Sequence, residues 1–310
     1  MKDIFKELIQ EICNEENIKC SFLCKDWVIM LEKNSITKFI YGYKFDLNSH
    51  GIGQIADDKY ALYEVLKRKE LPVVEHNIVY STSNKCDYAS GCNNYDYVKN
   101  YFKEHNNHII IKANIGSCGR KVYEVNTIDD IETILNKLFN TYHSVSICPF
   151  YKIKHEYRLI MLDETVELLY VKQLPLVYGD GIKSVRQLLF DFNYNYFFDK
   201  LDDSKYDAIL NKDDEFLYTW KFNLSQGSIA KKTNDKLLIQ KLYTLAKKVC
   251  KETNIKFGSV DIIQTDEDEL LVLEINSGVM IENYLMQYPE DYDVVKNIYK
   301  KAINKMFLLS

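Results

Sequence analysis

The chain has 310 residues, of which 46% are hydrophobic and 27% are charged, and this balance excludes an intrinsically disordered protein. Its net charge of −5 argues against a general nucleic-acid binder, because such proteins carry an excess of basic residues. No apolar run approaches the roughly 18–20 residues that a membrane-spanning helix needs, so we expect no membrane partner.

The N-terminal segment 2–13 carries apolar residues on one helical stripe, which predicts an amphipathic helix rather than a signal peptide. The 8 cysteines contain no C-x-x-C pair, so a zinc ribbon is not expected. Their low density in a chain of this length fits reduced thiols, and we therefore expect a cytoplasmic protein. Short strands are predicted at 28–31 and 36–41.

Two features at residues 51–68 have alternative interpretations. Gly51, Gly53 and Ala56 match a loose dinucleotide fingerprint, but they follow a polar run and not a strand. A nicotinamide-binding oxidoreductase is therefore one alternative function. A helix is predicted from Ala56 to Arg68, and Lys59 in its first turn is either a solvated lysine or a phosphate contact.

A strand and glycine loop follow a polar connection at 81–94 and a helix at 95–104. The buried strand 109–111 leads directly to Lys112, and the loop 114–120 contains two glycines before another strand begins at Val122. Backbone N–H groups of such a loop can cover phosphates, with a lysine beside them as a point charge. An ordinary hairpin with a glycine turn is the alternative.

The middle of the chain is predicted to be rich in strands. A strand at 144–148 leads into Pro149, and the next strand carries Glu156 and Arg158 on one face. Further predicted elements are a helix at 128–140, a strand at 166–172, a glycine turn at 179–181, an aromatic and acidic segment at 191–214, a polar glycine stretch at 220–227, and helices at 238–249 and 294–306.

The segment 258–278 predicts a hairpin of two apolar strands, 259–264 and 270–275, joined by the acidic turn 266–269. Centring the hairpin on this turn places Asp261 opposite Glu274, and Asn276 shares the face of Glu274. Oxygen ligands of this kind suit Mg²⁺, which binds a few carboxylates and completes its shell with phosphates and water. The alternative is a half-buried hairpin with solvated acids.

These segments, in this order, resemble the ATP-grasp superfamily of ligases from about Ile55 to Tyr284. The resemblance implies that Lys59 and Lys112 contact nucleotide phosphates and that Glu156 holds the ribose. It also implies that Arg158 faces the reaction centre. The other nucleotide contacts that it implies are Gly116, Ser117 and Gly119 in the flap, Phe150 and Tyr151 at the adenine hinge, and Asn223.

Two stretches point to the carboxylate–amine ligase branch. LPLVYGDGIKSVRQLL and KFNLSQGSIAKKT resemble segments of the cyanophycin synthetase ligase module and related glutamate and D-alanine–D-alanine ligases. Departures from the family pattern include Ala113 after the lysine, Pro149 near the hinge, and Ser277–Met280 after the metal asparagine. Lys172 and Lys221 stand where arginine is common, and the resemblance implies that they hold the carboxylate substrate.

The resemblance implies an α+β (α/β) ATP-grasp fold with an N-terminal domain at 1–80, a central lobe with the flap at 81–150, and a C-terminal lobe with the metal site at 151–310. It implies a ligase that joins an amino-acid or small-peptide carboxylate to an amine through an acyl phosphate. Its cofactors would be ATP and two Mg²⁺ ions, or Mn²⁺, held by Asp261, Glu274 and Asn276. A homodimer is compatible with this reading. An ATP-grasp kinase acting on a hydroxyl group is the other alternative.

Overall fold

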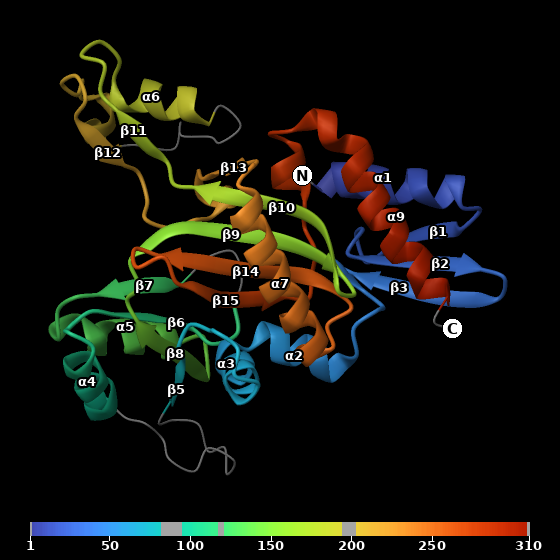
Figure 1. The fold of residues 1–310 in the computed structure, drawn as a ribbon, viewed down its shortest axis with the longest axis horizontal. Helices are drawn as coiled ribbons and strands as arrows, with labels where there is room; N and C mark the ends of the chain where they lie inside the picture. The colour runs from blue at the N-terminus through green and yellow to red at the C-terminus, as the bar shows by residue number, and fades with distance from the viewer. Residues whose placement is uncertain (1, 82–94, 117–120, 194–202, 309–310) are drawn as a thin grey trace.

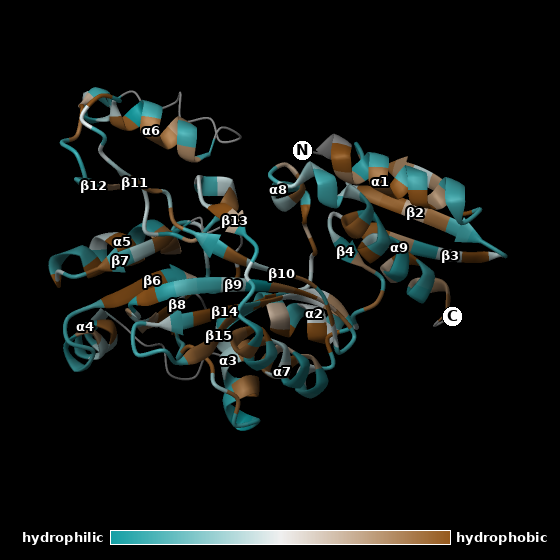
Figure 2. Cartoon of the chain, turned by 45° about the horizontal axis from the view of Figure 1, so that its top comes forward, coloured by the Kyte–Doolittle hydropathy of each residue, from teal (hydrophilic) through white to brown (hydrophobic). Residues whose placement is uncertain are grey.

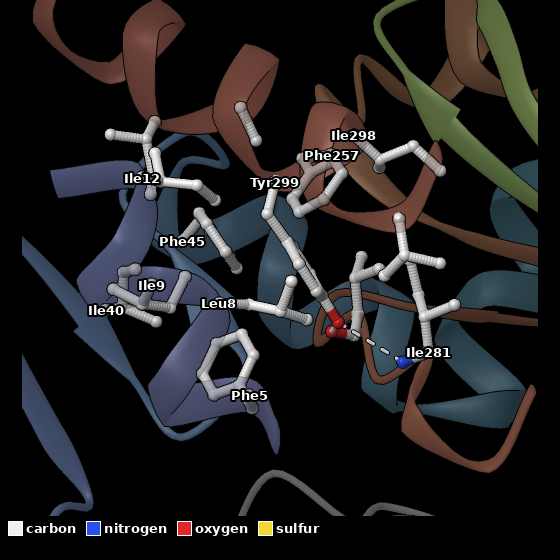
Figure 3. Close-up of a cluster of buried hydrophobic side chains, with 14 of the residues drawn as sticks. Phe5, Leu8, Ile9, Ile12, Ile40, Phe45, Phe257, Ile281, Ile298 and Tyr299 are labelled. Atoms are coloured by element: carbon white, nitrogen blue, oxygen red, sulfur yellow. Dashed lines mark hydrogen bonds between the residues drawn. The ribbon is translucent and has the colours of Figure 1, made fainter. Parts of the chain in front are cut away.

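The computed structural model describes residues 2–81, 95–116, 121–193 and 203–308. The first sheet is antiparallel, in the order β1 (Lys19–Leu23), β2 (Val28–Lys33), β3 (Ile36–Tyr41) and β4 (Lys44–Phe45). Helices α1 (Lys2–Glu15) and α9 (Tyr292–Leu308) pack beside it, so the two ends of the chain meet there (Figure 1). Tyr299 fills the middle of this core, and its hydroxyl accepts a hydrogen bond from the N–H of Ile281 (Figure 3). The same hydroxyl donates to the carbonyl of Val279.

The second sheet is antiparallel, in the order β5 (Asn77–Tyr80), β8 (Ser144–Pro149), β6 (Ile109–Ala113) and β7 (Val122–Val125). Helices α4 (Tyr95–Glu104) and α5 (Asp129–Phe139) pack with it around a shared apolar core. All five residues of β6 are buried. In Figure 2, β2 and β6 are mostly hydrophobic, whereas the helices α1 and α7 alternate between both kinds of residue.

The central sheet has the order β13 (Ile229–Lys231), β10 (Thr165–Gln173), β9 (Ile153–Leu162), β14 (Phe257–Thr265) and β15 (Leu270–Asn276). Helix α7 (Lys236–Thr253) crosses one face of it (Figure 1). Tyr157, Leu159 and Met161 of β9 point to that face, since they share a core with α7. Side chains alternate along a strand, so Glu156, Arg158 and Ile160 point to the opposite face.

Helices α2 (His50–Asp57) and α3 (Lys59–Arg68) lie against β15. Each begins with a capping side chain: Ser49 accepts a hydrogen bond from the N–H of Ile52, and Asp58 accepts one from the N–H of Ala61. The sequence predicts one helix at 56–68, and the structure has two. They are separate because Asp58 has an extended backbone, with φ −98° and ψ 110°.

A small lobe stands apart from the central sheet, at the upper left of Figure 1. It contains α6 (Val185–Phe192) and the two-stranded sheet of β11 (Leu176–Tyr178) and β12 (Glu215–Leu217). Gly179 must be glycine here, because a Cβ atom would lie 2.0 Å from the carbonyl oxygen of Asn211. The 3-10 turns η2 (Ser204–Asp207), η3 (Leu224–Gln226) and η4 (Pro289–Asp291) and the short helix α8 (Glu282–Leu285) complete the described elements.

The sheets do not follow the order of the chain strictly. Strand β5 lies within the segment 1–80 but pairs with β8 of the second sheet. Helix α9 comes from the C-terminal end but packs with α1. Within the described ranges, no helix is both long enough and apolar enough to cross a membrane.

Candidate functional site

A single row of side chains runs across four neighbouring strands of the central sheet. The strand pairing places each member directly opposite the next, so all of them lie on the face that α7 leaves open. The predicted pairing of Asp261 with Glu274 is confirmed, and a bulge follows directly after Asp261. From β10 to β15 the row consists of Tyr170, Arg158, Asp261 and Glu274.

Arg158 and Asp261 form a bidentate ion pair at the centre of this row. The Arg158 guanidinium donates from Nε to Oδ1 at 2.7 Å and from Nη2 to Oδ2 at 2.5 Å. Nη2 also lies 3.9 Å from the Glu274 carboxylate. Burial alone would raise the pKa of Asp261, but the charges of Arg158 and Lys172 outweigh burial and hold this pKa below its usual range.

Lys172 lies beside this pair and connects two buried carboxylates. Its ammonium donates to Asp261 at 2.9 Å and to Glu156, the residue directly opposite it on β9. Burial raises the pKa of Glu156 to about 7, although the charge of Lys172 acts in the other direction. The Lys172 side chain is only 4% exposed, and both hydrogen bonds go to protein groups. The ribose contact of Glu156 and the substrate contact of Lys172 stay predictions.

Glu274 and Asn276 are the metal candidates whose side chains are partly exposed. The Glu274 side chain is 30% exposed, and it accepts a hydrogen bond from the Asn276 amide at 3.2 Å. Asp261, by contrast, has no exposed surface, and both of its oxygens already accept hydrogen bonds from Arg158 or Lys172. The described residues contain no cluster of three His, Cys, Asp or Glu side chains suited to a metal. The donors are all oxygens, which fits Mg²⁺ bound together with phosphates.

Two lysines of the predicted site lie on other elements. Lys59 begins α3, and its ammonium donates to the carbonyls of Asn114 at 3.3 Å and Gly116 at 3.2 Å, where the glycine loop starts. Burial lowers the pKa of Lys59; the nearby Glu274 charge raises it, and the nearby Lys112 charge lowers it further. The charges of Glu274 and Lys112 therefore both act on Lys59. Ser117 and Gly119 lie outside the described residues.

The predicted adenine hinge lies in an apolar cluster between the second sheet and the β14–β15 hairpin. The Phe150 ring stacks on His108 with centroids 3.8 Å apart, and it meets Trp220 edge-on at 6.4 Å. The hydroxyl of Tyr151 accepts a hydrogen bond from the N–H of Glu75 at 3.4 Å. Both hinge residues are half-buried, so part of their apolar surface remains accessible.

The polar glycine stretch folds into a compact turn. Asn223 Oδ1 accepts hydrogen bonds from the N–H and the hydroxyl of Ser225, both at 2.9 Å. The hydroxyl of Ser228 donates to the carbonyl of Lys221 at 3.1 Å. Burial lowers the pKa of Lys221, and its ammonium lies 5.6 Å from the centroid of Trp220. Asn223 thus holds its own loop, and its nucleotide contact stays a prediction.

The sequence interpretation missed two residues at this site. His76 is 1% exposed, and its Nδ1 lies 2.8 Å from the hydroxyl of Ser146, which is opposite Lys112 in the sheet. No local pattern marks His76, because only the pairing of β5 and β6 with β8 places it there. Tyr170 could have been found, since it lies two residues before Lys172 and so shares its strand face.

The dinucleotide fingerprint lacks its structural context. Gly51 and Gly53 lie inside α2, which begins at His50, so they do not form a turn between a strand and a helix. The strands before them belong to an antiparallel sheet and not to a βαβ unit. The nicotinamide alternative therefore has no support from the fold.

No protein-family model and no curated protein matches the sequence. Solved structures do match. A bifunctional glutathione synthetase from Pasteurella multocida is 16% identical with a TM-score of 0.56; the alignment covers 95% of this chain but only 44% of that one. A D-alanine–D-alanine ligase from Bacillus anthracis is 12% identical, with a TM-score of 0.53 over 83% and 70% of the two chains.

A RiPP-associated ATP-grasp ligase from Chryseobacterium gregarium, in complex with ADP and a leader and core peptide, matches over nearly the full length of both proteins. The alignment covers 96% of this chain and 92% of that one, at 13% identity and a TM-score of 0.51. At such low identity these likenesses establish the fold and not the activity. The sheet order, the paired hairpin and these comparisons show that the chain has the ATP-grasp fold.

Proposed function

We propose that the protein is an ATP-dependent carboxylate–amine ligase that forms an amide bond and converts ATP to ADP and phosphate. The observation that carries this proposal is the cross-strand row of Arg158, Asp261 and Glu274, together with Lys59, whose charge interacts with those of Glu274 and Lys112. Cationic side chains and oxygen ligands placed together in this way suit a nucleoside triphosphate and its metal ion.

The proposed reaction has two steps. A carboxylate oxygen of one substrate attacks the γ-phosphorus of ATP, the bond to the β,γ-bridging oxygen breaks, and ADP leaves. The nitrogen of an amine then attacks the acyl carbon, the carbon–oxygen bond to phosphate breaks, and the amine loses a proton. Catalysis of such transfers is mostly positioning and charge neutralisation.

The protein groups have separate roles in this proposal. Lys59 and Lys112 would bind the phosphates, and Arg158 would stabilise the charge of the transferring group, since its planar fork matches phosphoryl oxygens. Glu274 and Asn276, with Asp261 behind them, would hold Mg²⁺, which supplies further positive charge to the phosphates. Lys172 holds Asp261 and Glu156 in place through a hydrogen bond to each carboxylate. Phe150 and Tyr151 would hold the adenine ring.

The substrates are proposed to be amino acids or small peptides. The structural neighbours are named as a glutathione synthetase, a D-alanine–D-alanine ligase and a RiPP-associated ligase bound to a leader and core peptide. The chain spans less than half of the first of these, so its substrates need not be the same. We place the reaction in the cytoplasm, where ATP is available and where the free thiols of Cys13 and Cys148 stay reduced.

The test measures ADP release while amino acids and dipeptides are supplied in pairs. We expect ADP only when a carboxylate and an amine are both present, and we expect hydroxylamine to trap the acyl phosphate as a hydroxamate. Glu274→Gln serves as the matched inactive variant. AMP and pyrophosphate as products would overturn the proposal, because attack would then be at the α-phosphorus. ADP formed with a hydroxyl substrate and no amine would favour the kinase.

A further inference from the structure

The base of the glycine loop is fastened to the first turn of α3. Asn114, the residue after β6, is only 1% exposed. Its carbonyl accepts a hydrogen bond from the N–H of Lys59 at 3.3 Å, and its Oδ1 accepts one from the N–H of Tyr60 at 3.1 Å. A single bridge between Asp58 and Ile115 continues this contact. The first N–H groups of a helix have no partner within the helix, so Asn114 is a second cap of α3 beside Asp58.

The same loop base also holds the side chain of Lys59. Its ammonium donates to the carbonyl of Asn114 at 3.3 Å and to the carbonyl of Gly116 at 3.2 Å. An ammonium group has three N–H bonds, so one remains for a ligand after these two contacts. The lysine is half-buried, so its end is not closed off from solvent. The position of the Lys59 charge therefore depends on where residues 114–116 lie against α3.

The orientation of the Asn114 amide follows from its neighbour. The N–H of Tyr60 can only donate, so the amide atom that faces it is the oxygen. The other end, Nδ2, is buried and has no hydrogen-bond partner among the residues that the structure describes. An unpaired buried donor costs free energy of folding. Asn114 therefore adds less to stability than its burial suggests, and its side chain makes one contact, which is to α3.

We propose that Asn114 is a positioning residue that holds Lys59 in place to bind a phosphate group of ATP. The inference rests on the proposed function, which assigns Lys59 to the phosphates. Lys112 lies on β6, two residues before Asn114, so one segment of the chain places both lysines. A lysine side chain loses much rotamer freedom when it binds a ligand. Holding its ammonium in advance reduces that loss and strengthens binding.

The first test is a double-mutant cycle on nucleotide affinity. Calorimetric titration with a non-hydrolysable ATP analogue compares the wild type, Asn114→Ala, Lys59→Met and the double variant. We expect Lys59→Met to weaken binding at least about tenfold, since a hydrogen bond to a charged group is lost. Asn114→Ala should weaken it about fivefold, because the lysine remains but is no longer held. The double variant should bind like Lys59→Met alone. Additive losses, or wild-type affinity in Asn114→Ala, would overturn the inference.

Asn48→Ala is the matched control. The Oδ1 of Asn48 also accepts N–H groups from a distant segment, from Lys256 at 2.7 Å and from Phe257 at 3.1 Å. The same side chain is removed, but at the start of β14 and not beside α3. We expect this variant to bind the analogue as the wild type does. A loss as large as that of Asn114→Ala would show that the effect is general loosening, and would overturn the positioning role.

Amide hydrogen exchange tests the contact with α3 without nucleotide. The N–H of Tyr60 should exchange at least about tenfold faster in Asn114→Ala than in the wild type, because its acceptor is gone. Asn114→Asp keeps an oxygen at this position, and a carboxylate is favourable at a helix N-terminus. Its Tyr60 N–H should therefore stay as protected as in the wild type. Equal exchange in Asn114→Ala and the wild type would overturn the inference.

The affinity cycle and ADP release together separate this inference from the proposed function. A coupled loss of affinity in a protein that releases no ADP with any substrate pair would refute the ligase and keep the positioning role of Asn114. Additive losses in a protein that releases ADP with a carboxylate and an amine would refute the positioning role and keep the ligase.

Discussion

Arg158 on β9 donates two hydrogen bonds to Asp261 on β14, and the acceptor carboxylate has no exposed surface. Lys172 donates to the same carboxylate at 2.9 Å. One buried negative charge therefore holds two cations, the buried Lys172 and the part-buried Arg158. A buried ion pair is costly to break because the remaining charge loses its partner. Asp261 is a structural anchor of the central sheet as well as a candidate metal ligand.

Asp261→Asn should destabilise the protein more than any other substitution in the row. The variant leaves Arg158 and Lys172 without their shared charge, and removing one partner of a buried pair costs about 3–5 kcal/mol. Urea unfolding without nucleotide measures this loss. A loss below about 1 kcal/mol would contradict the anchoring role, because that size is typical of an exposed ion pair.

Glu274→Gln should separate activity from stability. The Glu274 side chain is part-exposed, and its carboxylate lies 3.9 Å from the Arg158 guanidinium, which is long for an ion pair. Its charge therefore contributes little to the free energy of unfolding, within about 1 kcal/mol. As a candidate metal ligand it should still be essential, and ADP formation should nearly vanish at every Mg²⁺ concentration. A near-normal rate would remove the metal assignment from this hairpin.

Asn276→Ala should give a milder defect at the same site. Its amide is neutral and hydrogen-bonds Glu274, so it contributes less to holding a cation than a carboxylate does. We expect a partial loss of ADP formation that higher Mg²⁺ restores in part. The measurement is the rate against Mg²⁺ concentration, beside the wild type, and a defect that Mg²⁺ leaves unchanged would argue for a purely structural role.

The hairpin was predictable from sequence, and most of the pairing around it was not. The polar turn 266–269 fixes which residues face each other, so the pairing of Asp261 with Glu274 could be read locally. The pairing of Asp261 with Arg158 joins residues more than 100 positions apart, and no local pattern specifies it. The predicted face shared by Glu156 and Arg158 is correct, but their partners follow from the strand order.

The first sheet shows the same limit. Strand β1 was missed, because Lys19, Cys20 and Ser21 give no clear alternation of polar and apolar residues. Strands β2 and β3 were found, since Ile29, Leu31 and Ile40 mark a buried face. The β1–β2 pairing turns the side chain of Cys20 toward the core, where it packs partly buried. Tertiary pairing therefore decides the weaker strands.

Lys112→Ala should weaken ATP binding. The lysine is 8% exposed at the end of β6, and the positive charges of Lys112 and Lys59 act on the same neighbours. The loss of a hydrogen bond to a charged phosphate costs about 1.5–3 kcal/mol, which calorimetric titration with a non-hydrolysable ATP analogue can measure. Lys103→Ala, on the exposed surface of α4, is the control. Equal affinities for the two variants would show that Lys112 does not contact the nucleotide.

His76 should make the stability of the protein depend on pH. Burial, and then the charges of Lys112 and Lys59, hold the pKa of His76 well below its usual value of 6.5. The unfolded chain takes up a proton near pH 6.5 and the folded chain does not. The unfolded state therefore binds more protons below that pH, and the free energy of unfolding falls as the pH falls. Between pH 7.5 and 5.5 this one group should cost about 1.4 kcal/mol.

The comparison of His76→Gln with the wild type isolates this contribution. The variant lacks the titrating ring, so its stability difference from the wild type should shift by about 1.4 kcal/mol, in favour of the variant, between pH 7.5 and 5.5. His50→Gln, at the exposed start of α2, is the matched control and should show no such shift. Urea unfolding at both pH values measures all three proteins. A difference that is the same at both pH values would show that His76 accepts a proton in the folded protein, and Lys59 and Lys112 would then have a third cation near them.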